Sequence, residues 1–278
     1  MTLGRDHWYL LPEHPTAIQV SGGLTSGYML HEILRVNGGL PSHCRVIFQN
    51  TGREHEATLD FVAEMAYQWD VEIVWLEYTR ETGVPTARVV DHATASRQGE
   101  PFDALLAAEQ FLPSHSRRFC TRQLKILTAR RWLRAQGWDW WYSATGFRAD
   151  ESERMLGSWD DDKIVRLFPM VYAGVTKAEV HTYWRKQNWG LKLPDVMDEN
   201  PLGNCDGCFL KSESQRAHLA QEEPERFAWW QGWEERLGKQ FARGSSYQEL
   251  AEFVRGKNLT QLDQAGILCQ KDGGDCTG

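Results

Sequence analysis

The sequence predicts an α/β protein built on a Rossmann-like parallel sheet, with a helical C-terminal region that carries cysteines. Short apolar runs alternate with amphipathic helical patterns through the first half of the chain, and the pattern changes to loops and short helices after Pro194. Alternating strands and helices are typical of a parallel sheet with right-handed crossovers. We therefore expect an α/β domain over residues 1–195 and a helical region over residues 196–278.

The first half of the chain supplies three expected strands and the helices between them. Apolar runs predict strands over 17–20, 45–48 and 72–76. Apolar residues at helical spacing predict helices over 26–36 and 54–69.

The second half is less regular. It predicts a helix over 121–134 and strands over 140–144 and 165–168. Thr176 and Glu179 have the spacing of a capping box, with Val175 and Val180 as a hydrophobic staple around it. Three further helices are expected over 211–221, 224–237 and 247–255.

Composition excludes several classes of protein. The 278 residues are 41% hydrophobic and 25% charged, as in folded globular chains. The net charge of −7 argues against indiscriminate coating of nucleic acid. No apolar run approaches the roughly 18 residues of a membrane span. The N-terminal residues lack a basic-then-apolar signal pattern, so we expect a cytoplasmic protein without a membrane partner.

A glycine-containing loop follows the first expected strand and opens the first helix: Ser21-Gly22-Gly23-Leu24-Thr25-Ser26. Glycines let the backbone approach an anion, and the N–H groups at a helix N-terminus favour phosphate. The hydroxyls of Ser21, Thr25 and Ser26 add donors. The segment matches neither the Walker A pattern nor GxGxxG. A plain strand-to-helix turn is the structural alternative, but the sequence favours phosphate binding.

Cysteines form the second candidate site. Cys205 and Cys208 stand three positions apart, which lets two thiolates reach one metal or cluster, or form a redox pair. Cys120 offers a third ligand, and the fourth is expected from the tail, at Cys276 or Cys269. Thiolate ligands alone leave zinc and iron–sulfur both open.

One basic segment surrounds the first of these cysteines. Between Gln110 and Trp138 there are seven cations and no acidic residue, and Cys120 lies among them. Positive surroundings lower a thiol pKa and stabilise an anionic thiolate cluster. The cations of segment 117–134 also suit a small anionic substrate or a nucleic-acid backbone as a partner. A solvated amphipathic helix is the alternative interpretation.

Taken together, the motifs resemble the phosphoadenosine phosphosulfate (PAPS) reductase-like proteins of phages and prophages. These belong to the adenine nucleotide α-hydrolase-like superfamily, also called PP-loop ATP pyrophosphatases. The similarity covers residues 15 to about 210. Besides the loop, where Thr25 replaces the usual Asp, the matching segments are 49–52 with Glu54, Glu56 and 61–62, then 119–121 with 125–126, 146–154 and 204–208.

The resemblance implies an adenine nucleotide at the carboxyl ends of the strands. The residues it implies around the phosphates are Ser21, Gly22, Gly23, Thr25, Ser26, Gly146 and Arg148. Asn50 and Thr51 would lie near the adenosine, and Arg148 would act in catalysis. The resemblance also favours a [4Fe-4S] cluster on Cys120, Cys205, Cys208 and Cys276, with zinc as the alternative metal.

The resemblance offers two enzymatic chemistries, of which we favour the first. ATP with Mg²⁺ adenylates an acceptor with release of pyrophosphate, and sulfur from a donor then displaces AMP. In the second, Cys276 attacks PAPS or its 3′-dephosphorylated form (APS), and sulfite is released with the help of a thiol reductant protein. The tail Gly274-Asp275-Cys276-Thr277-Gly278 lacks the following Gly and His of such reductases. A third reading is a non-catalytic nucleotide-binding module with structural zinc.

Overall fold

The computed structural model describes residues 4–156, 162–193 and 202–255. The expected domain boundary at residue 195 and the tail cysteines Cys269 and Cys276 lie outside these ranges.

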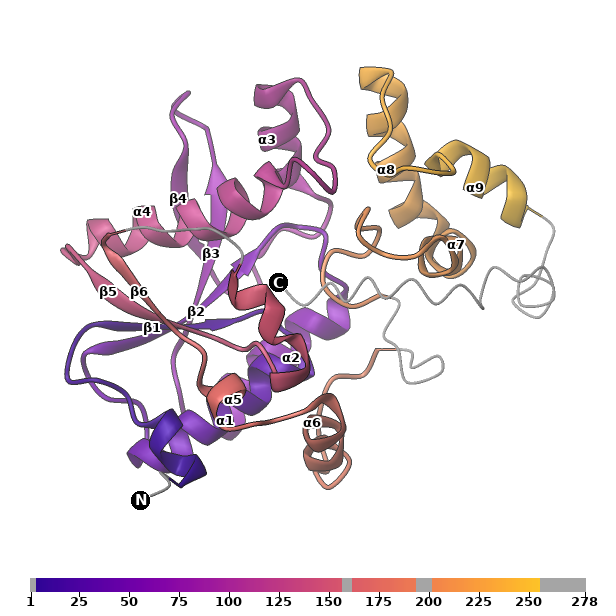
Figure 1. The fold of residues 1–278 in the computed structure, drawn as a ribbon. Helices are drawn as coiled ribbons and strands as arrows, with labels where there is room; N and C mark the ends of the chain where they lie inside the picture. The colour runs from indigo at the N-terminus through magenta and orange to yellow at the C-terminus, as the bar shows by residue number, and fades with distance from the viewer. Residues whose placement is uncertain (1–3, 157–161, 194–201, 256–278) are drawn as a thin grey trace.

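A six-stranded sheet forms the centre of the molecule, with strand order β4-β3-β2-β1-β5-β6 (Figure 1). All neighbouring strands run parallel except β3 and β4, which are antiparallel. The strands are β1 (Thr16–Val20), β2 (Cys44–Asn50), β3 (Ile73–Thr79), β4 (Thr86–Val90), β5 (Trp141–Thr145) and β6 (Ile164–Leu167). The predicted parallel α/β class is confirmed, and β4 is an added edge strand.

Helices connect the strands and form the C-terminal region. The α-helices are α1 (Leu24–Asn37), α2 (Glu56–Gln68), α3 (Glu100–Glu109), α4 (Thr128–Ala135), α5 (Pro169–Tyr172), α6 (Lys177–Trp184), α7 (Glu213–Glu222), α8 (Pro224–Leu237) and α9 (Tyr247–Val254). Shorter turns of helix are η1 (Arg5–Tyr9), η2 (Thr121–Leu127) and η3 (Ala149–Leu156). The helix expected over 121–134 is a π-helical turn, η2, that continues into α4. Within the described ranges, no helix combines the length and apolar character that crossing a membrane requires.

Side chains alternate across the sheet and so supply two cores. On one face, Ile18 of β1 packs in a buried cluster with residues of α1 and α2 such as Met29 and Leu59. On the other face, Ala17 packs with Leu133 of α4. Successive residues of a strand point to opposite faces, so β1 is covered by helices on both sides.

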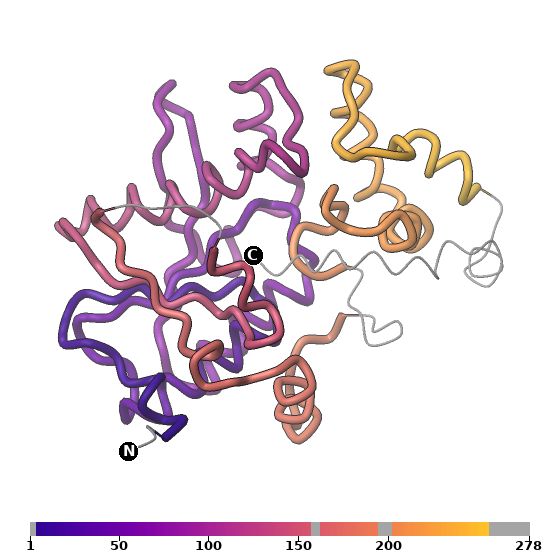
Figure 2. Tube along the Cα trace, viewed as in Figure 1, coloured from indigo at the N-terminus to yellow at the C-terminus, as the bar shows by residue number. Residues whose placement is uncertain are grey.

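A second large core joins the C-terminal helices to the α/β part. Leu105 and Leu106 of α3 and Leu124 of η2 are buried in one cluster with Phe227 and Trp230 of α8. Figure 2 shows the chain of α7–α9 beside that of α3. The helical region therefore packs directly on the elements around Cys120.

Helix starts differ from the prediction in one case. The capping box expected at Thr176 is wrong, because the Thr176 side chain forms no cap hydrogen bond. Instead the Lys177 N–H donates to Asp150 at 3.4 Å, and Glu179 pairs with Arg5. Val175 and Val180 are both buried in the first core. Capping boxes occur at α7, between Ser212 and Gln215, and at α9, between Ser246 and Glu249.

Candidate nucleotide and cysteine sites

The glycine loop lies at the carboxyl end of the central strand β1. Gly22 has φ +76°, and a Cβ built there would lie 2.4 Å from Thr58 Cγ2 of α2. Gly23 is the N-cap of α1; no side chain caps this helix end, and its first turn contains no acidic residue. A Cβ on Gly23 would meet only Ser21 Oγ, at 3.6 Å. The loop thus has one glycine required by its shape and one beside an uncapped helix N-terminus suited to an anion.

The loop hydroxyls divide into two roles. Ser26 Oγ donates to the Gly23 carbonyl at 3.0 Å and accepts from the Ser21 N–H at 3.0 Å. It also lies 3.2 Å from Ser21 Oγ. Ser26 is buried and therefore maintains the loop's shape. The hydroxyl of Thr25 instead accepts a hydrogen bond from Arg148.

Gly146 and Arg148 bring the end of β5 against this loop. A Cβ on Gly146 would lie 3.2 Å from Ser26 Cα, so the two backbones approach closely. Arg148 is 3% exposed and its Nη1 donates to Thr25 Oγ1 at 3.0 Å. Asp150 at 3.1 Å and Glu151 at 3.2 Å pair with the same guanidinium. The structure thus places the predicted phosphate-side residues of two neighbouring strands together.

Asn50 and Thr51 lie at the carboxyl end of β2, with side chains engaged inside the protein. Asn50 Nδ2 donates to Glu77 at 2.6 Å and to the Ser96 carbonyl at 2.8 Å. Thr51 Oγ1 donates to Glu54 at 2.9 Å and lies 3.4 Å from Cys205 Sγ. Their predicted place near an adenosine stays a prediction, whereas the contact of Thr51 with the cysteine loop is direct.

Three of the predicted metal ligands, Cys120, Cys205 and Cys208, lie close enough to Lys125 for their charges to act on it. Cys205 pairs through an isolated β-bridge with Glu54, the Cys208 N–H donates to the Cys205 carbonyl at 3.2 Å, and Cys120 is the N-cap of η2. Burial, helped by the charge of Cys208, raises the pKa of Cys120 to about 11. Burial and Glu54 raise the pKa of Cys205 further, against the opposing effect of Lys125.

The pKa of Lys125 is also set by burial and by the nearby thiols and Glu54. Burial lowers its pKa, but Cys205, Glu54, Cys208 and Cys120 outweigh that and keep the pKa above its usual value. One ammonium therefore compensates a group of thiols that would each be costly to ionise alone.

The spacing of the three described cysteine sulfurs bears on which metal group they could hold. Thiolates on one zinc ion, with Zn–S of about 2.3 Å, lie within about 4.6 Å of one another. Among the described residues, the only three His, Cys, Asp or Glu ligand atoms that all lie within 4.8 Å of one another belong to Glu56, Asp60 and His92. At least one pair of Sγ atoms among Cys120, Cys205 and Cys208 therefore lies more than 4.8 Å apart, a spacing that an iron–sulfur cluster, with ligands on several irons, could accommodate.

Asp206, between the paired cysteines, is the residue that sequence reasoning missed. It is fully buried, and Arg53 Nη2 donates to it at 2.7 Å and Arg226 Nε at 2.6 Å. Trp230 Nε1 and the Gly207 N–H also donate to it, at 2.8 and 2.7 Å. A buried carboxylate with two arginines thus fixes the loop that carries Cys205 and Cys208.

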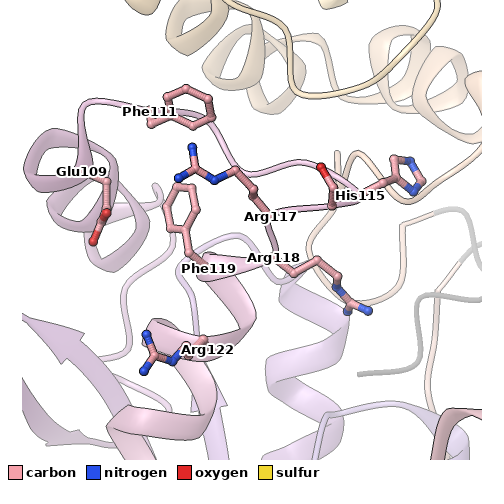
Figure 3. A pocket seen from close by; sticks show the side chains of 8 residues that line it. Glu109, Phe111, His115, Arg117, Arg118, Phe119 and Arg122 are labelled. Atoms are coloured by element: carbon pink, nitrogen blue, oxygen red, sulfur yellow. The ribbon is translucent and has the colours of Figure 1, made fainter. Parts of the chain in front are cut away.

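A cavity of about 550 Å³ opens between the end of α3 and the start of η2, next to Cys120 (Figure 3). Its lining includes Phe111, Phe119, Arg117, Arg118 and Arg122. Seven of its eight lining residues lie in the stretch without acidic residues between Gln110 and Trp138, and the eighth is Glu109.

Proteins similar to this chain are found by sequence and by fold. No family model matches the chain. It is 26% identical over 219 residues to the uncharacterized nin region protein ORF290 of Escherichia phage lambda, a match that covers 75% of this chain and 70% of that protein.

Three solved structures are similar at low sequence identity. A PAPS reductase from Candida auris, in a phosphate complex, has a TM-score of 0.40 and 18% identity, over 66% of this chain and 79% of that one. The U34-tRNA thiolase NcsA from Methanococcus maripaludis, with its [4Fe-4S] cluster, has a TM-score of 0.43 and 14% identity, and the match covers 92% of this chain and 88% of that one. NMN synthetase from Francisella tularensis has a TM-score of 0.41 and 16% identity, and the match covers 92% of this chain and 83% of that one. A phage protein is thus similar to this chain in sequence, and a PAPS reductase is among the solved structures similar to it.

Proposed function

We propose that this chain is an ATP-dependent enzyme that adenylates an acceptor and replaces the activated oxygen by sulfur. The observation that carries the proposal is the 3.4 Å contact between Thr51 Oγ1 and Cys205 Sγ. Thr51 follows β2, whose neighbour β1 ends at the glycine loop. The contact supports a nucleotide site and a cysteine site that share one edge of the sheet.

The proposed reaction balances without an oxidant or reductant. An acceptor oxygen attacks the α-phosphorus of ATP, the bond from that phosphorus to the bridging oxygen breaks, and pyrophosphate leaves. A sulfide then attacks the acceptor carbon, the carbon–oxygen bond breaks, and AMP leaves with that oxygen. Sulfur and oxygen exchange at the same oxidation state.

The glycine loop and Arg148 supply the charge stabilisation in this proposal. The uncapped N-terminus of α1 would hold the leaving pyrophosphate through its N–H groups and dipole. Arg148 stands beside Thr25, already oriented by Asp150 and Glu151. Donors fixed before the reaction stabilise developing phosphate charge without reorganising, and bound Mg²⁺ would add to this.

Cys120, Cys205 and Cys208 would hold a [4Fe-4S] cluster, with Cys276 or Cys269 as the proposed fourth ligand. With only the three described cysteines bound, such a cluster would supply a place to keep sulfide beside the nucleotide; a fourth cysteine from the tail would close that position. Lys125 would compensate part of the negative charge of the cluster thiolates, and Asp206 would keep the paired cysteines in position.

Metal content and nucleotide products together test the proposal. The chain is purified without oxygen, and iron, acid-labile sulfide and zinc are measured with the visible spectrum. We expect about four irons and four sulfides per chain. Pyrophosphate release from ATP should then require the acceptor, and release of labelled AMP from ATP labelled at the α-phosphate should require both the acceptor and sulfide.

Two outcomes would contradict it. About one zinc and no iron would make the cysteines a structural site. Sulfite released from PAPS with a thiol reductant, without ATP consumption, would make the chain a reductase.

A further inference from the structure

The pocket between α3 and η2 is lined by three arginines and one carboxylate, that of Glu109, so its net charge is positive. Arg117, Arg118 and Arg122 all line it and are exposed. None of the three guanidinium groups forms an ion pair with a described residue. Arg118 Nη2 reaches only the Thr121 hydroxyl, at 3.5 Å. Because the whole chain carries a charge of −7, this concentration of cations points to an anionic ligand at this place.

Aromatic rings stand among these cations. Phe111 and Phe119 both line the pocket, and Figure 3 shows the two rings on either side of the Arg117 side chain. The Arg117 guanidinium lies 4.8 Å from the centre of the Phe111 ring, and Lys239 Nζ lies 3.9 Å from it. Aromatic faces next to guanidinium groups offer stacking surfaces for planar bases as well as charge for phosphates.

The pocket also adjoins the cysteine site. Phe119 directly precedes Cys120. His115, at the pocket rim, lies with Nε2 3.0 Å from the carbonyl of Phe209, the residue after Cys208. A ligand in the pocket would therefore lie close to the segments that carry Cys120 and Cys208, two of the three described cysteines of that site.

We propose that this pocket binds single-stranded nucleic acid, with phosphates on the three arginines and an unpaired base against Phe111 or Phe119. An unpaired strand is favoured over a duplex because stacking on a side chain needs a base released from its own stack. It is favoured over an acidic peptide because a carboxylate chain would leave the aromatic rings unused. The pocket would thereby present the acceptor of the proposed sulfur transfer, and only this last role rests on the proposed function.

The test is fluorescence anisotropy with a labelled 12-nucleotide single strand, as DNA and as RNA, without ATP and over a range of salt. The double variant Arg117→Ala/Arg122→Ala should bind at least tenfold more weakly. Its salt slope should be shallower by about 1.4, since each phosphate contact to a single strand contributes about 0.7. Phe111→Leu should weaken binding at least about fivefold, since stacking is lost while an apolar side chain remains.

The matched control removes two cations elsewhere. Arg185 and Lys186 are exposed at the end of α6, which lies at the bottom of Figure 1, whereas α3 lies at the top. Arg185→Ala/Lys186→Ala should leave affinity for the strand within about twofold. Equal losses in both double variants would overturn the proposal, because general charge would then explain binding.

Competitors separate the remaining possibilities. Unlabelled single strand should displace the probe, whereas the matching duplex, polyglutamate and millimolar inorganic phosphate should not. If polyglutamate or phosphate displaced the probe as well as the unlabelled strand does, the pocket would bind an acidic peptide or a small anion, and the nucleic-acid proposal would be wrong. ATP binding, measured on the same variants, should be unchanged. Strand binding without ATP turnover would sink the proposed function alone, and turnover without strand binding would sink this inference alone.

Discussion

The guanidinium of Arg148 donates a hydrogen bond to the hydroxyl of Thr25 at 3.0 Å, and so joins the loop after β5 to the loop after β1. Arg148 is held on its other side by Asp150 and Glu151. The side chain is thereby fixed beside the glycine loop. Thr25 stands where the resembling family has Asp, so in this chain a neutral hydroxyl faces the arginine.

Arg148→Lys should weaken ATP binding about tenfold, since lysine cannot reproduce the forked donor geometry. Equilibrium binding of ATP measures this, and thermal unfolding checks that the fold survives. Thr25→Ser keeps the hydroxyl and is the control, whereas Thr25→Val removes it and should share part of the loss. Equal ATP affinity in Arg148→Lys and the unchanged protein would remove Arg148 from the nucleotide site.

The two loop glycines should respond differently to substitution. Gly22→Ala places a Cβ at positive φ and against Thr58, so it should cost about 1–3 kcal/mol of stability. Gly23 has φ −97°, and a Cβ there would make only an ordinary contact, so the fold should survive Gly23→Val. The branched valine side chain should, however, block the N-terminus of α1. Denaturant unfolding and nucleotide binding measure the pair. Unchanged affinity of Gly23→Val for both ATP and PAPS would disprove the loop assignment.

Cys205→Ser should lose most of the bound metal, since a thiolate that lies beside Thr51 and Glu54 is replaced by a poor ligand. Iron, sulfide and zinc content of the protein purified without oxygen gives the answer. Cys44→Ala is the matched control, because Cys44 is a buried thiol on β2 packed away from the cysteine site. Full metal retention in Cys205→Ser would exclude the cluster as proposed.

Asp206→Asn should destabilise the protein by about 3–5 kcal/mol, because Arg53, 1% exposed, would keep its charge without a carboxylate partner. Metal content should fall with it, since the loop between the cysteines loses its anchor. Asp139→Asn is the control: its carboxylate is 97% exposed and pairs with Arg134 at 3.5 Å, so stability should change by less than about 1 kcal/mol. A stable Asp206→Asn protein with full metal would show that the network is dispensable.

The parallel sheet could be predicted because its strands are short apolar runs separated by helical patterns. The edge strand β4 could not, since Thr86–Val90 is mostly exposed and leaves no buried alternation in the sequence. The capping box at Thr176 failed because a carboxylate from another loop, that of Asp150, accepts from the next N–H. Local spacing carries no information about such a competitor.

In the candidate sites, too, some features could be predicted from the sequence and others could not. Contiguous motifs located the glycine loop and the paired cysteines. The contacts that organise them link residues far apart in the chain, as between Arg53 and Asp206 or between Thr25 and Arg148. Pairs of this kind leave no spacing pattern, so their roles became visible only in three dimensions.

The shared core of α3 and α8 has a consequence for how the chain melts. Leu105 and Leu106 are buried in one cluster with Phe227 and Trp230, and the ring of Phe102 on α3 lies 5.7 Å from that of Trp230. Loss of the C-terminal helices would expose apolar surface on α3 at once, so neither part can open at low cost while the other stays intact. Calorimetry should therefore record one cooperative transition, with calorimetric and van't Hoff enthalpies in agreement.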